Sequence, residues 1–330
     1  MTIIDTAVNK INSSSCWIVM TVFLIILISV VYVYRLFFID INSDSSESNK
    51  SKAEAFTLNR DETKKVGEES LDTFYANIYE NLFYSDLVDD YEVGIILNKT
   101  KPVKQTDVLV IGSKTGKHVD TLTSKGFNGY GMEKSKDMVS YSEKKYPDSK
   151  YVVGDGTNQL TFETEKFTLI TLLDFAVYTI SNRRMLFENC YKWLVPGGFL
   201  AIHLMNVGGF YDSQTYGARE RRFSPGVMRL FNKQTVPNCL GNNDAVIDDI
   251  IYRSEMKMSV HDPEKIELRE TFKNRKNGNK RQNVQNFYTP DQTIILSEIK
   301  DSGFNMLAQY DLNSYDKPFQ YIYILYKPSN

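Results

Sequence analysis

Cysteine is scarce in this sequence, with three residues of this type among 330. Cys16, Cys190 and Cys239 are widely spaced, and Cys16 borders an apolar run. Such spacing predicts neither a disulfide framework nor a cysteine-based metal cluster, and it favours a reducing compartment. The cysteines therefore give no reason to expect a metal site.

The sequence also lacks an excess of either charge. It contains 39 Lys and Arg residues and 41 Asp and Glu residues, which gives a net charge of −2. A nearly neutral chain gives no reason to expect nucleic acid as the main partner. The basic run "ARERRFSPGVMR" at residues 218–229 is the exception. It could bind an anionic substrate or lipid headgroups, or it could be a solvated loop.

One long apolar run, "WIVMTVFLIILISVVYVY", occupies residues 17–34. A helix over residues 17–39 would cross the hydrocarbon core of a bilayer, which is about 30 Å thick. A cleaved signal peptide would be shorter and would end in small residues, but "RLFFIDI" follows here. The sequence thus predicts a short tail, 1–16, and a single-pass transmembrane helix, 17–39. The Lys and Arg counts on its two sides lean slightly toward a cytosolic globular domain.

A polar, charged stretch follows the apolar run and reaches residue 70. It has too few large apolar residues to offset the entropy of ordering, which predicts a flexible linker over residues 40–70. The remaining chain, 71–330, is long enough to bury the core of one domain. The sequence gives no indication of its oligomeric state.

Apolar strand patterns alternate with helical patterns from residue 107 onward. Continuous apolar strands between helices predict a parallel sheet covered on both faces, so we expect an α/β, doubly wound, mostly parallel sheet of seven strands. Residues 206–289 interrupt the alternation and predict an antiparallel insertion after the fifth strand, placed as a lid or substrate platform over the ligand crevice. The expected strands are 107–112, 129–133, 151–155, 167–175, 199–205, 305–312 and 319–327.

The loop "GSKTGKH" at residues 112–118 follows the first strand of this sheet. A phosphate-binding P-loop would be one residue longer and would carry a hydroxyl side chain at His118. A dinucleotide fingerprint would need glycine at Lys114 and Lys117. Both alternatives fit the loop poorly.

A third pattern fits better, because "VLVIGSKTGKHVDTL" resembles the first motif of class I S-adenosylmethionine (SAM)-dependent methyltransferases, in particular small-molecule N-methyltransferases. "GYGMEKSKDMV", "YVVGDG", "KFTLITLLDFAVYTI", "WLVPGGFLAIHL" and "DSGF" resemble later motifs in the same order, and "FYANIYENLFYSDLVDDYE" resembles the family's N-terminal helix. In the first motif the matches are Gly112, Thr115 and Gly116, and the departures are Val110 for an acid, Ser113 for cysteine and Lys114 for glycine.

The resemblance implies SAM as cofactor and assigns roles to particular residues. Glu133 would accept both ribose hydroxyls, Met138 would pack on the adenine, and Asp155 would accept the adenine amino group. Glycines in the first loop would let the backbone approach the ligand closely. The expected cofactor-binding residues are Gly112, Ser113, Lys114, Thr115, Gly116, Glu133, Met138, Asp155, Gly156, Asp174 and Phe175.

Methyl transfer is an in-line displacement, so alignment supplies most of the catalysis and a base helps only where the acceptor must lose a proton. Tyr178 and His203 are the candidate catalytic residues, and Tyr75 and Tyr79 lie on the predicted capping helix. The function favoured is a membrane-anchored methyltransferase acting on a small molecule, lipid or protein. The alternative is a catalytically inactive methyltransferase fold that serves as an anchored binding or scaffold module, which the departures in the first motif favour.

Overall fold

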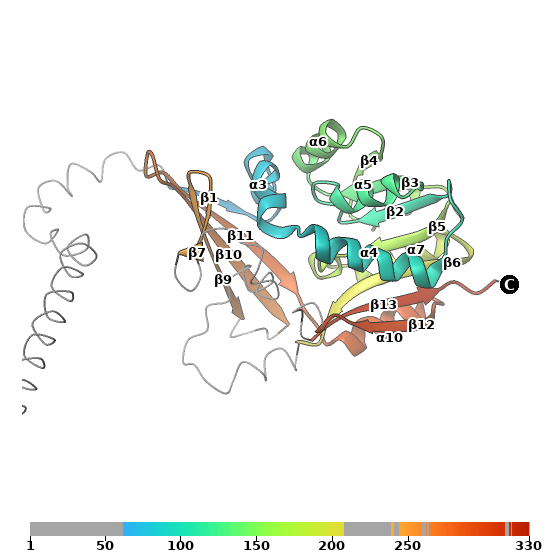
Figure 1. Ribbon diagram of the computed structural model, residues 1–330. Coiled ribbons are helices and arrows are strands. Elements are labelled where there is room, and N and C mark those ends of the chain that lie inside the picture. Colours follow the sequence, from blue (N-terminus) through green and yellow to red (C-terminus); the bar gives the residue numbers. More distant parts are fainter. Residues whose placement is uncertain are drawn as a thin grey trace, which may run out of the picture. The chain divides into compact units, whose positions relative to one another are not determined.

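The computed structural model describes residues 62–207, 239–240, 244–258, 262, 264–313, 317 and 319–329 (Figure 1). The predicted tail, transmembrane helix, most of the linker and the basic run lie outside the described residues. Within the described ranges, no helix is both long enough and apolar enough to cross a bilayer.

A seven-stranded sheet forms the body of the domain, as the alternating pattern predicts. Its strand order is β12-β13-β6-β5-β2-β3-β4, and β4, β3, β2, β5 and β6 run parallel. The last two strands pair antiparallel at one edge. The strands are β2 (Asp107–Ile111), β3 (Asn128–Glu133), β4 (Lys150–Val153), β5 (Phe167–Leu172), β6 (Leu194–Met205), β12 (Asn305–Asp311) and β13 (Gln320–Tyr326).

Helices cover both faces of this sheet because side chains along a strand alternate between the faces. Leu109 and Ile111 of β2 pack in one core with α7 (Arg183–Trp193) and α10 (Gln292–Asp301). Val108 and Val110 pack in a second core with α4 (Asp86–Thr100) and α5 (Lys117–Ser124). The remaining helices are α3 (Thr73–Phe83), α6 (Lys136–Lys145) and the short η1 (Gly67–Ser70), η2 (Gln159–Thr161) and η3 (Ala176–Thr179).

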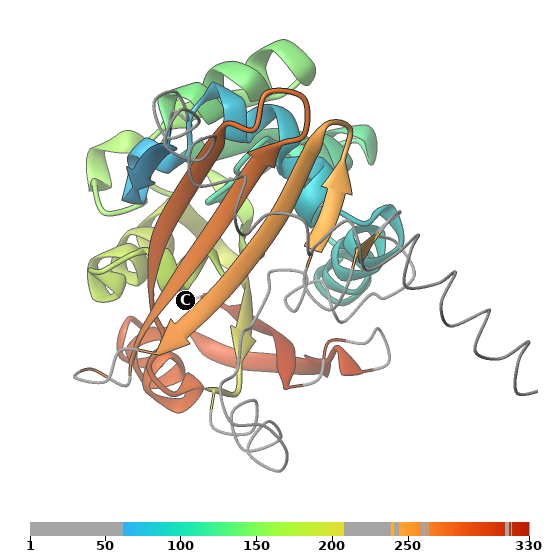
Figure 2. The same cartoon turned by 90° about the vertical axis from the view of Figure 1, so that its left-hand side faces the viewer.

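The insertion after β6 contributes most of a second sheet, of order β1-β11-β10-β9-β8-β7 (Figure 2). The antiparallel pairing expected of this insertion is present, and β8 and β9 form a hairpin that turns at Asp248, which has a φ of +50°. The strands are β7 (Cys239–Leu240), β8 (Asp244–Ile247), β9 (Ile250–Met258), β10 (Lys265–Asn274) and β11 (Lys280–Tyr288).

The sixth strand, β1 (Glu62–Val66), lies within the segment that was predicted to be a linker, so that prediction is wrong for these residues. It pairs in parallel with β11, from Glu62 beside Lys280 to Val66 beside Val284. Residues 62–70 were expected to be a flexible linker, but they form this strand and η1. The segment gave no strand signal because its side chains are mostly exposed and its stabilising hydrogen bonds come from the backbone.

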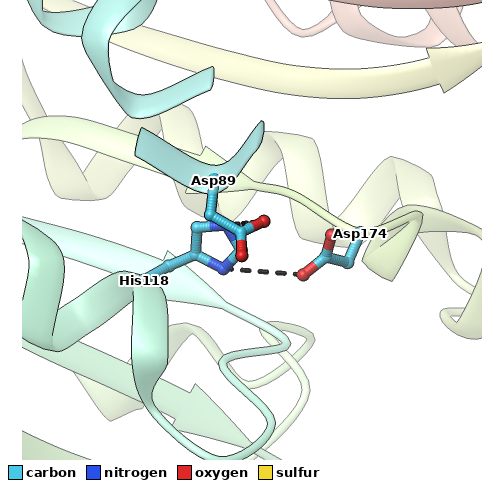
Figure 3. A group of neighbouring side chains, drawn as sticks. All are labelled: Asp89, His118 and Asp174. Carbon is cyan, nitrogen blue, oxygen red and sulfur yellow. Dashed lines mark ion pairs between the residues drawn. The ribbon is translucent and has the colours of Figure 1, made fainter. Parts of the chain in front are cut away.

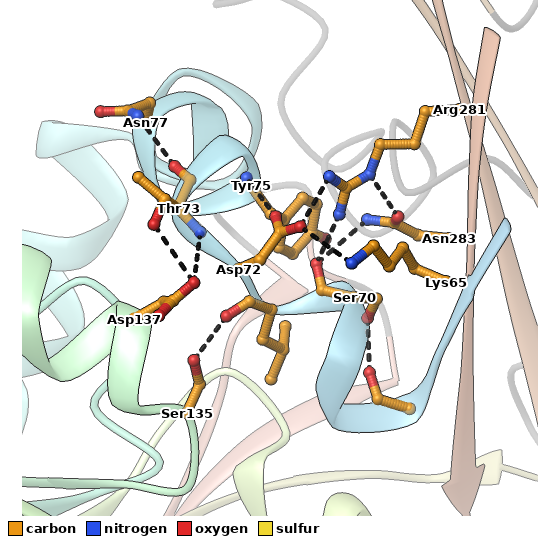
Figure 4. Close-up of polar contacts among 12 residues, drawn as sticks. Lys65, Ser70, Asp72, Thr73, Tyr75, Asn77, Ser135, Asp137, Arg281 and Asn283 are labelled. Carbon is orange, nitrogen blue, oxygen red and sulfur yellow. Dashed lines mark hydrogen bonds and ion pairs between the residues drawn. The ribbon is translucent and has the colours of Figure 1, made fainter. Parts of the chain in front are cut away.

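Polar contacts fix the segment between η1 and α3 to β11 of the second sheet and to α6 (Figure 4). Asp72 caps α3 through the amide of Tyr75 and pairs with Arg281 of β11 at 2.9 Å. Arg281 also donates to the carbonyl of Ser70. On the other side, Ser135 at the start of α6 donates to the carbonyl of Leu71. This set of contacts, called here the Asp72 junction, holds α3 between the two sheets.

A buried carboxyl group lies on the inner face of the second sheet. Glu270 of β10 has no exposed surface and accepts hydrogen bonds from the hydroxyls of Tyr75 and Tyr252, both at 2.8 Å. Burial raises its pKa to about 7, although these hydrogen bonds and Arg281 act in the opposite direction. The fold therefore favours the protonated form of Glu270.

We expect the Glu270 carboxyl to make the domain less stable as the pH rises. Its stabilising contribution is fully present below the unfolded pKa of 4.5 and is lost as the pH approaches the folded value of about 7. At about 1.4 kcal/mol per pKa unit, the loss is of order 3 kcal/mol. Urea unfolding between pH 5 and 8 should show a smaller pH dependence in Glu270→Gln than in the wild type. Glu267→Gln, on the same strand but partly exposed, is the control, and identical pH profiles for all three proteins would contradict the assignment.

Candidate active site

Two adjoining pockets lie at the carboxyl ends of the parallel strands. The Glu133 pocket is lined by the ends of β2, β3 and β4 and by η1 and β11, and it includes Gly112, Lys114, Glu133 and Asp155. The Asp174 pocket is lined by α3, α4, the turn after β5 and the second sheet. Leu71, Lys114, Thr179 and Gln285 line both pockets, so they form the boundary between them.

Glycine is required in the first loop mainly by packing. Gly112 has a φ of +71°, and a Cβ there would lie 2.5 Å from the Cβ of Ala176. Gly116 has a φ of +86°, and its Cβ would lie 2.6 Å from the hydroxyl of Tyr151. We expected Gly116 to make room for a ligand, but the space beside it is taken by the Tyr151 ring. Of these two glycines, only Gly112 contributes to the wall of either pocket.

Lys114 turns inward, toward Glu133. Its amide donates to Glu133 Oε2 at 3.1 Å, and its ammonium lies 3.6 Å from the same oxygen. The Lys114 side chain is only 11% exposed. The other Glu133 oxygen, Oε1, accepts from the amide of Ser135 at 3.3 Å. The carboxylate expected to receive the ribose is thus already paired with the residue that replaces the motif's middle glycine.

Asp155 lies in the same pocket and is held as a carboxylate. Its Oδ1 accepts from the amide and hydroxyl of Thr157, and its Oδ2 lies 3.6 Å from the Lys134 ammonium. Burial opposes ionisation, but the contacts with Thr157 and Lys134 outweigh it and lower the pKa of Asp155. Gly112, Lys114, Glu133 and Asp155 are therefore brought together, as the motif order predicts.

Four other predicted cofactor residues do not line either pocket. Ser113 and Thr115 are buried, and their hydroxyl oxygens have no hydrogen-bond partner in the described part of the chain. Met138 is fully buried in a cluster with Tyr75 and Tyr79, so it supports α3 and is not on a pocket wall. Gly156 packs under α7, where a Cβ would lie 2.4 Å from Leu186.

The turn after β5 brings Asp174 and Phe175, both predicted to bind the cofactor, to the second pocket. Both residues have a positive φ, +48° and +59°, which non-glycine residues adopt only at a cost of order 1 kcal/mol or more each. The ring of Phe175 lies on that of His203, with centroids 4.4 Å apart. Tyr75 and Tyr79 of α3 face them across the pocket.

His203 lines the pocket, but it is a weak base. Its Nε2 lies 3.2 Å from Oε1 of Gln320, and its Nδ1 has no hydrogen-bond partner among the described residues. Burial lowers the pKa of His203 to about 4. The imidazole is therefore neutral at pH 7.

Tyr178, the other predicted catalytic residue, does not reach either pocket. It is 1% exposed, and its hydroxyl accepts from the amide of Met205 at 2.9 Å. Burial raises its pKa above the ordinary tyrosine value. The prediction of Tyr178 as a base is corrected, since the side chain joins η3 to the end of β6 instead.

A buried charged group beside the Asp174 pocket was not predicted. Asp89 and Glu92 lie on the buried side of α4, and Lys317 pairs with Glu92. His118 lies between Asp89 and Asp174. The sequence did contain a sign of this group. The spacing of Asp89 and Glu92 puts both acids on the same face of α4 as the apolar Val88 and Ile96.

Comparisons with known proteins agree with this geometry. The family described as a methyltransferase domain matches residues 109–202, from β2 to β6. A search of curated proteins gave no significant match. Since the matched span ends before the insertion, it covers the strand-end residues of the Glu133 pocket but neither η1 nor the second sheet, which also line it.

Solved structures are similar over most of the chain. A SAM-dependent methyltransferase from Clostridium acetobutylicum is 17% identical, with a TM-score of 0.57, covering 77% of this chain and 98% of its own. The CcbJ methyltransferase from Streptomyces caelestis is 12% identical, with a TM-score of 0.60. The alignment covers 80% of this chain and 99% of CcbJ. SAM-bound CalS10, an amino pentose methyltransferase from Micromonospora echinaspora, is 15% identical, with a TM-score of 0.54. The alignment covers 77% of this chain and 96% of CalS10.

The fold is that of a class I SAM-dependent methyltransferase. The comparisons also support SAM as the cofactor. The protein's own residues fit it, since one pocket is lined by the Gly112 backbone and by the carboxylates of Glu133 and Asp155. A ribose at Glu133, as the motif predicts, would compete with the Lys114 ion pair.

We expect Lys114→Gly to bind SAM about 5- to 10-fold more tightly, because a partly screened ion pair worth about 1 kcal/mol no longer competes for Glu133. Glycine also suits the φ of +51° at this position. Glu133→Ala should bind about 10- to 100-fold more weakly, since hydrogen bonds to a charged group contribute about 1.5–3 kcal/mol. Calorimetric titration measures both.

Lys117→Ala is the matched control, because this lysine lies in the same loop and pairs with the exposed Asp86. Its affinity for SAM should equal that of the wild type. Weaker binding by Lys114→Gly would show that the lysine contacts the cofactor directly and does not compete with it.

Proposed function

We propose that the chain is an active SAM-dependent methyltransferase with a small-molecule acceptor. The observation that carries this proposal is the convergence of Gly112, Glu133 and Asp155 on one pocket, with the Asp174 pocket directly beside it. The first pocket suits the nucleoside part of the cofactor. The second, on the far side of Lys114, suits the methionine part and the acceptor.

A small acceptor is favoured by what surrounds the second pocket. Tyr75 and Tyr79 of α3 lie over it, and Leu268 and Phe287 of the second sheet form another wall. Helix and sheet are joined by the Asp72 junction and by the Tyr75–Glu270 hydrogen bond. Such an enclosed, partly aromatic pocket suits a ligand of limited size. CalS10, described as an amino pentose methyltransferase, supports the same class of acceptor by fold-level analogy.

SAM supplies the activated methyl group, and the protein's residues align the acceptor and exclude water. The aromatic walls remove water from the acceptor, and the turn at Asp174 and Phe175 fixes the pocket floor. His203 is neutral at pH 7 and can accept a hydrogen bond from the acceptor through Nδ1. No strong base is required where the nucleophile is already unprotonated.

The proposal predicts methyl transfer to the low-molecular-weight part of a cell extract. Purified protein is incubated with methyl-labelled SAM and with separated small-molecule, lipid and protein fractions. Label should enter the small-molecule fraction, and Glu133→Ala should reduce the rate at subsaturating SAM by about 10- to 100-fold, in line with its weaker cofactor binding. Tyr178→Phe is the matched control, since its ring lies outside both pockets, and it should retain transfer activity.

Absence of SAM binding and of transfer to every fraction would instead favour the alternative, an inactive fold that serves as a binding module. The Lys114–Glu133 ion pair is the observation in favour of that alternative, because it engages the Glu133 carboxylate that is expected to bind the ribose of SAM.

We further propose that residues 17–39 anchor the domain to a membrane, with the domain on the cytosolic side. The support is the length of the apolar run and its flanking residues. The full chain should stay with membranes after alkaline carbonate washing, whereas a chain lacking residues 1–39 should be released. Removing residues 40–61 instead should leave the chain on the membrane. Release of the full chain by carbonate would refute the anchor.

A further inference from the structure

Three elements bring a histidine and two carboxylates together beside the Asp174 pocket (Figure 3). Asp89 comes from α4, His118 from α5, and Asp174 from the turn after β5. The side chains of Asp89 and His118 are 6% and 3% exposed, so both are almost fully removed from water. Asp174 is 26% exposed and faces the pocket.

The separations in this group are long for hydrogen bonds. His118 Nε2 lies 3.8 Å from Asp89 Oδ1, and His118 Nδ1 lies 3.5 Å from Asp174 Oδ2. One nitrogen of the ring and one oxygen of each carboxylate lie within 4.8 Å of one another. Ligand atoms around one transition-metal ion are about 3 to 3.5 Å apart, given bonds of about 2.0–2.2 Å. Because Asp89 lies nearest Nε2 and Asp174 nearest Nδ1, the side chains must rotate to bring one ring nitrogen and both carboxylates to that spacing.

Unpartnered polar atoms point to a missing ligand. Within the described residues, His118 Nε2 has no hydrogen-bond partner, although the residue is buried. Glu92 Oε2 and His203 Nδ1 are buried and lack partners as well. These two residues form a second possible ligand group that shares Asp174 with the first. Buried polar atoms are nearly always paired, so several orphans in one place require an explanation.

The charge of the cluster points the same way. Asp89, Glu92 and Asp174 are three carboxyl groups, and Lys317 is the cation that pairs with one of them, Glu92. Buried carboxylates normally pair with cations or coordinate metals. Asp89 has His118 as its nearest ionisable partner. Lys317 acts on Asp89 and Asp174 at longer range, but among the described residues neither carboxyl group forms an ion pair with a permanent cation.

We propose that Asp89, His118 and Asp174 bind one divalent transition-metal ion. The mixture of imidazole and carboxylate suits Mn²⁺, Fe²⁺ or Zn²⁺ better than Ca²⁺ or Mg²⁺, which prefer oxygen ligands alone. This triad is preferred over the Glu92 and His203 group because those residues already contact Lys317 and Gln320. Asp174 lines the pocket, so an open coordination position of the ion would face the acceptor.

Manganese binding to the metal-stripped protein tests the site without SAM or an acceptor. Calorimetry with Mn²⁺ should give one ion per chain, and pulsed electron paramagnetic resonance should detect one coupled imidazole nitrogen. His118→Ala should weaken binding by more than about 100-fold, because it removes a direct ligand. Asp86→Asn should bind as the wild type does, since Asp86 lies on the same helix but is exposed.

Asp174→Asn provides a second variant at a partly exposed position, in case His118→Ala does not fold. It should also lose Mn²⁺ affinity while keeping the wild-type circular dichroism spectrum. A wild-type manganese spectrum without nitrogen coupling would overturn the proposal whatever the variants do. So would equal affinity in the wild type and Asp174→Asn, which indicates an adventitious ion. Neither result would bear on SAM binding.

Discussion

The Asp72 junction is the constraint on which the arrangement of the site depends. The seven-stranded sheet supplies loops at its carboxyl edge, but loops alone do not enclose a ligand. Asp72 starts α3 and binds Arg281, while the neighbouring Leu71 carbonyl accepts from Ser135. One short segment thereby fixes the capping helix to β11 on one side and to α6 on the other. Both pockets exist because these surfaces are held together.

The body of the fold was predictable from local patterns. Apolar runs that alternate with helical patterns predict the first five strands as a parallel set, and the two closing strands were also expected. β1 was not predictable, because an edge strand with exposed polar side chains shares its composition with a linker. Only its partner β11, which is more than 200 residues away in the chain, makes it a strand.

The site was predicted in part, for a related reason. Motif order brings Glu133 and Asp155 to one pocket because Glu133 ends β3 and Asp155 follows β4, and these parallel strands end at the same edge of the sheet. Side-chain direction is not encoded in that order. Tyr178 points back to β6, and Lys114 points into the pocket. The Asp89, His118 and Asp174 cluster comes from three separate elements, so no single stretch of sequence revealed it.

The parallel pairing of β1 with β11 also has a mechanical consequence. Residue 62 is where the described domain meets the preceding chain, and the first element there is an edge strand of the second sheet. Tension applied from the N-terminal side would act along β1 and load its hydrogen bonds to β11 together, in shear. Because β11 continues from Val284, its last residue beside β1, to Gln285 and Phe287, the strand that bears this load also forms a wall of the Asp174 pocket.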